Sequence, residues 1–401
     1  MAPREPRMSF MTDEGPSEVP IGDVFSDIPL FREIQRVLLS SSGPVNWELA
    51  RQVGIAVAVG NANDPAPDEK DRRGFEDAVR VAELQVADFT GLSAPGEVAQ
   101  VRPMRRAQWV EANITGLKEI VEPAAAKVGA AFEGLRKEEA GEAEEARAIS
   151  ATLGQISPLL LGAQVGMVLG YLGQYVLGQF DIAVPRPGPV GLYFVLPNIA
   201  SFEQDWSLEP IEFREWVALH EVTHRFEFAR PWARDHFTRL LNDFVETLEL
   251  DVSGVQERIE RMDIANPEAM QSLFESGEGL FGAILDDEQR LKLERIQAFM
   301  AAAEGYGDHV MHGIGRKMLS TYSQIEEAMR RYRETETGDP VFERLLGIEM
   351  KREQYRLGRA FCDQVADATE ERVLARMWDS PESLPSMPEL IEPTLWMSRS
   401  V

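Results

Sequence analysis

Apolar residues recur at three- and four-residue steps along most of the chain, the spacing that places them on one face of an α-helix. The pattern predicts a helix that begins at Asn46 and further helices over residues 31–40, 74–89, 103–121, 123–153, 210–250, 286–313 and 341–378. Residues 148–180 carry no charge and are strongly apolar, which predicts a buried helix there. We therefore expect a mainly α protein with a small antiparallel β element.

One segment carries a clear strand signal. Residues 191–196 read Gly-Leu-Tyr-Phe-Val-Leu and end at Pro197, and a proline-rich stretch over 181–189 precedes them as a linker or loop. This break suggests a disordered N-terminal segment over 1–25, a helical N-terminal domain over 26–185 and a second domain over 186–401. We expect the second domain to finish in a helical region and an extended tail that starts near Ser380, because four prolines follow there.

The uncharged stretch imitates a membrane span in its length and apolar character. It contains four glycines at three- and four-residue steps, namely Gly162, Gly166, Gly170 and Gly173. In lipid such a stripe favours close helix pairing. Gln164, Gln174 and Gln179 interrupt the stretch, however, and no cluster of Lys or Arg flanks it. We expect no membrane span but a buried helix that packs closely on a neighbour.

The composition of the chain disfavours some functions and indicates a folded protein. With 67 acidic and 41 basic residues the net charge is −26, which disfavours binding to nucleic acid or to an anionic membrane surface. The 44% of apolar residues predict a folded chain. The single cysteine, Cys362, rules out an internal disulfide and fits a cytoplasmic protein, in which it would pack as a small core residue.

The five histidines of the chain all lie between residues 220 and 312, and two of them form an H-E-x-x-H motif, His220-Glu221-x-x-His224. On a helix this spacing places both imidazoles on one face, where they can bind one Zn²⁺. Glu221 can then act as the general base on water. Arg225, which follows the motif, is expected at the edge of the cleft, paired with Glu227 or another acid.

A catalytic zinc site needs a third protein ligand and an open coordination position. The best candidate is Glu304, on the helix predicted over 286–313, and Asp308 lies one turn further on the same face. In this arrangement Glu304 binds zinc and Asp308 steadies a ligand histidine from behind. His309 and His312 are alternative ligands or donors to the oxyanion. His236 is disfavoured, because the glycine-turn spacing of a third-histidine ligand is absent.

Two further features could serve the same site. Tyr306 is a second candidate for donating a hydrogen bond to the oxyanion, together with His312. The predicted strand over 192–196 either pairs with an extended substrate as an edge strand or only covers the core.

Beyond the motif, the chain resembles the type 2 zincin-like metallopeptidases, a bacterial family whose members are described as hydrolases or are associated with deazaflavin coenzyme biosynthesis. The similar stretches are residues 43–47, 217–224, 304–306, 354–358 and 384–396. The resemblance implies that His220 and His224 bind zinc, that Glu221 is the catalytic base, and that Glu304 is the third ligand. It also implies that residues 186–401 form a zincin-like catalytic domain around the metal-binding helices.

Together these features predict a zinc-dependent metallohydrolase that cleaves a peptide or amide bond. The alternatives are a zinc hydrolase of a small amide or ester and a non-catalytic protein with a structural zinc. A strongly negative field attracts cations, so we expect basic or neutral substrates. The sequence gives no indication of the oligomeric state.

Overall fold

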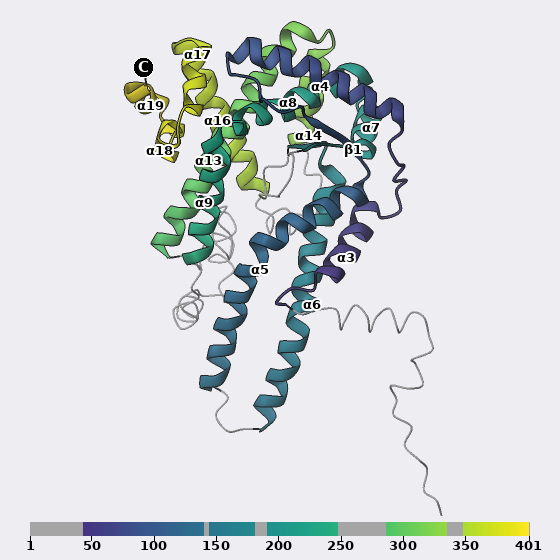
Figure 1. Ribbon diagram of the computed structural model, residues 1–401, viewed down its shortest axis with the longest axis vertical. Coiled ribbons are helices and arrows are strands. Elements are labelled where there is room, and N and C mark those ends of the chain that lie inside the picture. The colour runs from purple at the N-terminus through teal and green to yellow at the C-terminus, as the bar shows by residue number, and fades with distance from the viewer. Residues whose placement is uncertain (1–42, 140–143, 181–190, 248–285, 335–347, 401) are drawn as a thin grey trace, which may run out of the picture.

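The computed structural model describes residues 43–139, 144–180, 191–247, 286–334 and 348–400, and most of this part of the chain is helical (Figure 1). The expected mainly α fold is confirmed. The predicted disordered segment over 1–25, the helix over 31–40 and the proline-rich loop over 181–189 lie outside the described residues. None of the described helices is both long and apolar enough to cross a membrane.

The long helices follow the predicted periodicity. They are α3 (Trp47–Val59), α4 (Glu69–Thr90), α5 (Arg106–Glu139), α6 (Glu144–Tyr175), α7 (Leu196–Asp205), α8 (Pro210–Phe228), α9 (Pro231–Thr247), α13 (Asp287–Met318), α14 (Tyr322–Glu334) and α16 (Ile348–Ala368). Helix α5 runs through Pro123, where we expected two helices. The stretch predicted as one helix over 210–250 is divided between α8 and α9 at residues 229 and 230.

The C-terminal tail is helical, and the expectation of an extended tail is wrong. After α17 (Glu371–Leu374) and two 3₁₀ helices, η1 (Ala375–Trp378) and η2 (Pro381–Ser383), come α18 (Met387–Ile391) and α19 (Pro393–Ser400). Ser386 and Glu389 form a capping box at the start of α18. Proline is well tolerated in the first turn of a helix, and Pro381, Pro388 and Pro393 stand in the first turns of η2, α18 and α19.

The sheet has three strands, β1 (Gln100–Met104), β2 (Gly178–Phe180) and β3 (Gly191–Val195), in the order β1-β3-β2. Strands β2 and β3 form the expected antiparallel pair, and β1 adds a parallel neighbour on the other side of β3, so the sheet is mixed. The predicted strand is therefore the central one. It cannot pair with a substrate as an edge strand, because both of its edges are already occupied.

Strand β3 separates two hydrophobic cores. All five of its residues are buried, and successive side chains point to opposite faces. Leu192 and Phe194 join the larger core, which is formed with α4, α8, α13 and α16. Tyr193 and Val195 join a smaller core with α3, α5 and α6. A strand buried on both faces reads as a continuous apolar run, which explains its clear signal in the sequence.

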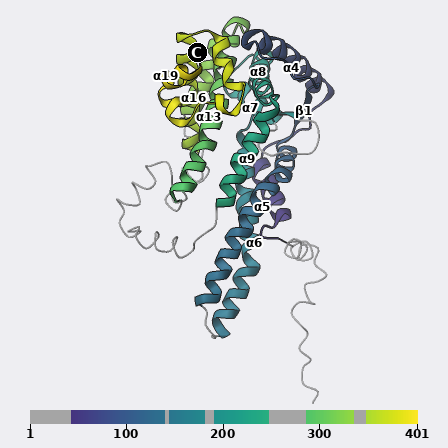
Figure 2. The ribbon, with the colours of Figure 1, turned by 60° about the vertical axis from the view of Figure 1, so that its left-hand side comes forward.

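The apolar helix packs closely on a neighbour, as its glycines predicted. Helix α6 lies against α3, and a Cβ atom added at Gly166 would meet the Ala50 carbonyl oxygen at 2.6 Å. At Gly170 it would meet the Gly54 carbonyl oxygen at 2.7 Å. Figures 1 and 2 show α5 and α6 running side by side as a long hairpin.

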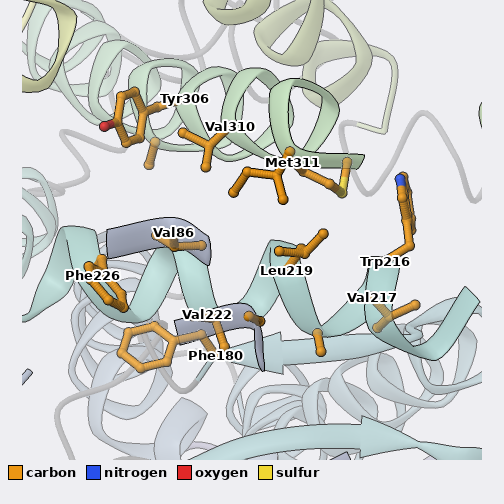
Figure 3. Close-up of a cluster of buried hydrophobic side chains, with 14 of the residues drawn as sticks. Val86, Phe180, Trp216, Val217, Leu219, Val222, Phe226, Tyr306, Val310 and Met311 are labelled. Atoms are coloured by element: carbon orange, nitrogen blue, oxygen red, sulfur yellow. The ribbon is translucent and has the colours of Figure 1, made fainter. Parts of the chain in front are cut away.

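Helices from both expected domains share the larger core. Phe75 and Val86 of α4 belong to the same buried cluster as Leu219 and Val222 of α8. Cys362 of α16 is also buried there. In Figure 3, α8 and α13 face each other across a layer of apolar side chains, and this packing fixes the relative position of the two helices that carry the H-E-x-x-H motif and Glu304.

Candidate metal centre

Helix α8 presents the two motif histidines on one side of a deeply buried helix. Pro210 stands in its first turn, and the Glu209 side chain accepts a hydrogen bond from the Glu212 backbone N–H at 2.7 Å. Most residues from Phe213 onwards are buried. His220 and His224 lie one turn apart, with their ring centres separated by 4.6 Å.

Glu212 connects the start of α8 to the end of α13. Its carboxylate accepts hydrogen bonds from the Ser320 and Thr321 hydroxyls, both at 2.5 Å, and from the Thr321 backbone N–H at 2.7 Å. These bonds lower the pKa of Glu212 to about 2. The two helices that carry the candidate ligands are thus joined beyond their apolar contact.

Helix α13 approaches the histidines closely because Gly307 has no side chain. A Cβ atom there would lie 3.2 Å from Cε1 of His224 and 3.6 Å from Cε1 of His220. On its other side, α13 crosses α16 at Gly305 and Gly358, where an added Cβ would overlap backbone atoms of the facing helix. The small residues of this stretch therefore let α13 fit between α8 and α16.

Glu304 of α13 completes a group of three potential ligands with His220 and His224. The Nε2 atoms of His220 and His224 are 3.2 Å apart. Oε2 of Glu304 lies 3.7 Å from Nε2 of His220 and 3.6 Å from Nε2 of His224. A triangle with these sides has a circumradius of about 2.0 Å, close to the Zn–N and Zn–O bond lengths of about 2.0–2.2 Å. The three donor atoms therefore fit a zinc ion.

Glu227 forms a hydrogen bond with the ring nitrogen of His224 that faces away from Glu304, a contact that the sequence did not reveal. Its Oε2 lies 2.8 Å from Nδ1 of His224, and the carboxylate is fully buried. A proton on Nδ1 leaves Nε2 free to act as a ligand, the carboxylate–histidine arrangement common in zinc sites. Glu227 follows His224 by three residues and so shares its helix face, a spacing that could have revealed the contact.

The group has a surplus of buried negative charge. Burial alone would lower the pKa of His224, but the neighbouring carboxylates of Glu227 and Glu304 raise it well above the usual value. Burial also raises the pKa of Glu227. Carboxylates buried this deeply are costly unless a cation balances them, which agrees with a metal-binding role.

The Glu221 carboxylate lies against strand β2. Its Oε2 accepts a hydrogen bond from the Phe180 backbone N–H at 2.6 Å, and the carboxylate is buried. A Cβ atom at Gly178 would lie only 2.5 Å from Oε1 of Glu221. The edge strand beside the motif is therefore β2, which the sequence reasoning missed because only three residues form it.

Asp308 and His312 lie on α13 beyond Glu304. Asp308 accepts a hydrogen bond from Arg359 at 3.0 Å, and its Oδ1 is 3.5 Å from Nε2 of His312. Nδ1 of His312 is 2.5 Å from the Tyr322 hydroxyl. These partners of His312 lie on α13 and α14. Its expected role as an oxyanion donor stays a prediction, as does the role of Asp308 behind a ligand.

Tyr306 and the other two histidines are not part of the group formed by His220, His224 and Glu304. Tyr306 is fully buried in the larger core (Figure 3), and burial raises its pKa well above the usual value. Its ring centre lies 6.0 Å from that of Trp378. His309 contacts Asp363 at 2.7 Å and Glu371 at 3.0 Å. His236 lies on α9, and its ring contacts aromatic side chains.

Arg225 does not pair with Glu227, which was one of its two expected partners. Its guanidinium donates hydrogen bonds to the Glu83 carboxylate of α4 and to the Glu97 carbonyl. The other expectation, pairing with some other acid, is met by Glu83. Arg225 thus connects α8 to α4 on the side of the helix away from the histidine ligands.

Comparison with known proteins places this geometry in a family. A solved structure of a candidate hydrolase with a novel fold from Chloroflexus aurantiacus is 32% identical, with a TM-score of 0.63 over 88% of this chain and 98% of that one. No curated protein matches the sequence. The family model of the zincin-like metallopeptidases matches residues 45–397, and the chain therefore belongs to the zincin-like metallopeptidase family.

Proposed function

We propose that the protein is a zinc-dependent hydrolase that cleaves a peptide or amide bond, with His220, His224 and Glu304 as zinc ligands. The observation that carries the proposal is the triangle of donor atoms, whose sides of 3.2, 3.6 and 3.7 Å suit one zinc ion. Three protein ligands with a free fourth position are typical of catalytic sites, whereas structural zinc sites use four. The His220 side chain is 20% exposed, so solvent reaches the site from that side.

Zinc bound here would supply a Lewis acid that polarises a carbonyl group and lowers the pKa of water. Glu221 would accept a proton from the attacking water and transfer it to the leaving nitrogen. The Phe180 N–H bond to Oε2 keeps the Glu221 carboxylate in one orientation during both transfers. Glu227 would hold the ring of His224 and its tautomer.

The substrate class follows from charge and shape. The net charge of −26 attracts cations and repels anions, which favours neutral or basic peptides and amides over acidic ones. Strand β2 lies at the edge of the sheet beside Glu221, but the Phe180 N–H on its free side is already bonded to the Glu221 carboxylate, so we do not expect a substrate to add there as a further strand. Esters and small amides belong to the same proposal, because the same chemistry cleaves them.

The decisive experiment is the substitution Glu221→Gln, which keeps the size of the side chain but removes the base. We expect zinc content, measured by elemental analysis, to stay at one ion per chain while hydrolysis of a peptide library and of small amides and esters is lost. Retained turnover in this variant would refute the assignment of Glu221. If no substrate is turned over by the zinc-loaded wild type, while zinc removal sharply lowers the melting temperature, the ion is structural and the proposal fails.

A matched substitution separates binding from catalysis. His220→Ala removes a ligand, so zinc content and hydrolysis should fall together. Glu221→Gln should lower hydrolysis only. Equal loss of zinc in both variants would show that Glu221 acts as a ligand and not as a base.

A further inference from the structure

A cavity of about 400 Å³, open to solvent on one side, lies between the start of α5, the end of α6, α7 and α14. The candidate zinc ligands lie on α8 and α13 and do not line it. Its walls include the rings of Tyr175, Phe202, Trp206 and Tyr332. Ligand pockets in proteins are typically about 300–1,000 Å³ and lined by such apolar and aromatic side chains, so this cavity has the size and character of a binding site.

Arg106 lines the cavity with a buried positive charge. The residue is only 8% exposed. Its Nε donates a hydrogen bond to Oδ1 of Asn198 at 2.6 Å. Within the part of the chain that the structure describes, this is the only recorded partner of the guanidinium, and no carboxylate forms an ion pair with it. Arg106 lines the cavity, and among the described residues no side chain or carbonyl accepts a hydrogen bond from its two terminal nitrogens.

The surroundings fix the orientation of Arg106. The amide nitrogen of Asn198 donates to the carbonyl oxygens of Gly173 and Val176, at 3.0 and 2.7 Å, which turns the amide oxygen of Asn198 towards Arg106. The backbone N–H of Arg106 donates to the Asp64 carboxylate at 2.9 Å. With backbone and Nε both held, the guanidinium presents its two terminal nitrogens as a rigid fork, the geometry that binds a carboxylate or phosphate with two hydrogen bonds.

An arginine stays charged at any physiological pH. The terminal nitrogens of Arg106 are not among the fully buried polar atoms of the described residues, so an anion from solvent can reach them. We propose that the cavity binds a small organic anion, a carboxylate or a phosphate ester, whose anionic group contacts the terminal nitrogens of Arg106 and whose flat apolar part lies against the aromatic walls. Phe202 and Tyr332, with ring centres 5.1 Å apart at an angle of 82°, form one corner of these walls.

Asp205 is the other charged residue of the lining, and its side chain is exposed. Its carboxylate weakens the attraction for anions, so removing this charge tests whether the cavity prefers anionic ligands. Replacing Asp205 with Asn should strengthen anion binding, whereas a cavity that takes neutral or cationic ligands should show no change or a weaker affinity.

The test is titration calorimetry with three probes that share a phenyl ring: benzoate, phenyl phosphate and benzamide, the neutral counterpart of benzoate. We expect benzoate or phenyl phosphate to bind the wild type saturably and benzamide to bind at least tenfold more weakly, because charge-assisted hydrogen bonds are the strong ones. The tighter of the two anions identifies the class of ligand. Equal binding of benzamide, or no saturable binding of either anion, would overturn the proposal.

Variants assign the binding to Arg106. Arg106→Gln should weaken binding of the preferred anion at least tenfold, Arg106→Lys should have an intermediate effect because it keeps the charge without the fork, and Asp205→Asn should strengthen binding. Arg102→Gln, an exposed arginine on β1, is the matched control and should bind like the wild type. Wild-type affinity in Arg106→Gln refutes the site. Should that variant not fold, wild-type affinity for the preferred anion in Arg106→Lys refutes it equally.

This inference does not depend on the proposed hydrolase activity. Anion binding at Arg106 can be measured in Glu221→Gln or in the zinc-free protein. Loss of hydrolysis with intact anion binding, or the reverse, therefore distinguishes the two proposals.

Discussion

Glu227 gives the most informative test of the metal centre, because the sequence motif does not include it. In Glu227→Gln the amide oxygen can still accept the hydrogen bond from Nδ1 of His224, but the negative charge 2.8 Å from this ring is lost. The contact is fully buried, so solvent cannot replace it. We expect zinc affinity to fall about 10- to 100-fold, or roughly 1.4–2.7 kcal/mol, the usual effect of removing a carboxylate that orients a ligand histidine.

The assay is competition for zinc against a chromogenic chelator at fixed pH and salt, with the melting temperature of the zinc-free protein as a check on folding. Glu215→Gln is the matched control, because it removes one negative charge from the same helix without a recorded contact to the three ligands. Its zinc affinity should stay within about twofold of the wild type, since charges near the surface are well screened. If Glu227→Gln binds zinc as tightly as Glu215→Gln, the carboxylate does not orient His224 and the reasoning is refuted.

Three further outcomes follow from contacts described above. Gly178→Ala should lower turnover at least tenfold at unchanged zinc affinity, measured by steady-state kinetics and chelator competition, because its Cβ would lie 2.5 Å from Oε1 of Glu221. Burial lowers the pKa of His309, but the carboxylates of Asp363 and Glu371 outweigh this effect and raise the pKa to about 9. The protonated ring therefore stabilises the folded protein fully below a pH of about 6.5, and this stabilisation is lost as the pH rises through about 9. The free energy of unfolding by urea should therefore fall over this range by at most about 3 kcal/mol, and His309→Gln should flatten that fall. Gly358→Ala should destabilise the protein by about 1–3 kcal/mol or more in the same urea assay, because its Cβ would overlap the Ala301 carbonyl oxygen.

Gly74→Ala serves as the control for both glycine variants. No atom lies within 4 Å of an added Cβ at this helical position, so the change should leave turnover unaltered and stabilise the protein slightly. Unchanged turnover in Gly178→Ala would show that strand β2 yields to the extra methyl group and does not constrain Glu221. A pH dependence of stability that is the same in His309→Gln would assign the effect to other groups.

The sequence was most informative where chemistry depends on spacing along one helix. The i, i+4 relation of His220 and His224 needs only a helix to bring the two rings together, and its apolar periodicity predicted that helix. Glu304 required a further step, the packing of a second helix across the first. The alanines and glycines around it indicated that such a close approach was feasible, and the structure brings the three side chains together.

Contacts between distant segments could not be read in the same way. Strand β2 has three residues and no alternation long enough to recognise, so its bond to Glu221 was not foreseen. Strand β3 was recognisable in the sequence as a continuous apolar run because both of its faces are buried. Such a run does not indicate whether the strand lies in the centre or at the edge of the sheet. Arg225 pairs with Glu83, which is 142 residues away, and local spacing carries no information about such a partner.

The glycine stripe of α6 has a consequence for hydrolysis. Helix α6 ends at Tyr175 and β2 begins at Gly178, so only two residues separate this helix from the strand whose Phe180 N–H binds the Glu221 carboxylate. Because backbone atoms of α6 and α3 are in close contact at Gly166, α6 has little freedom to slide or tilt, and its end fixes where β2 begins. A methyl group at Gly166 would push α6 away from α3, and we expect β2 and the Glu221 carboxylate to shift with it. Under the proposed function, a helix contact that includes none of the candidate zinc ligands would thereby influence turnover.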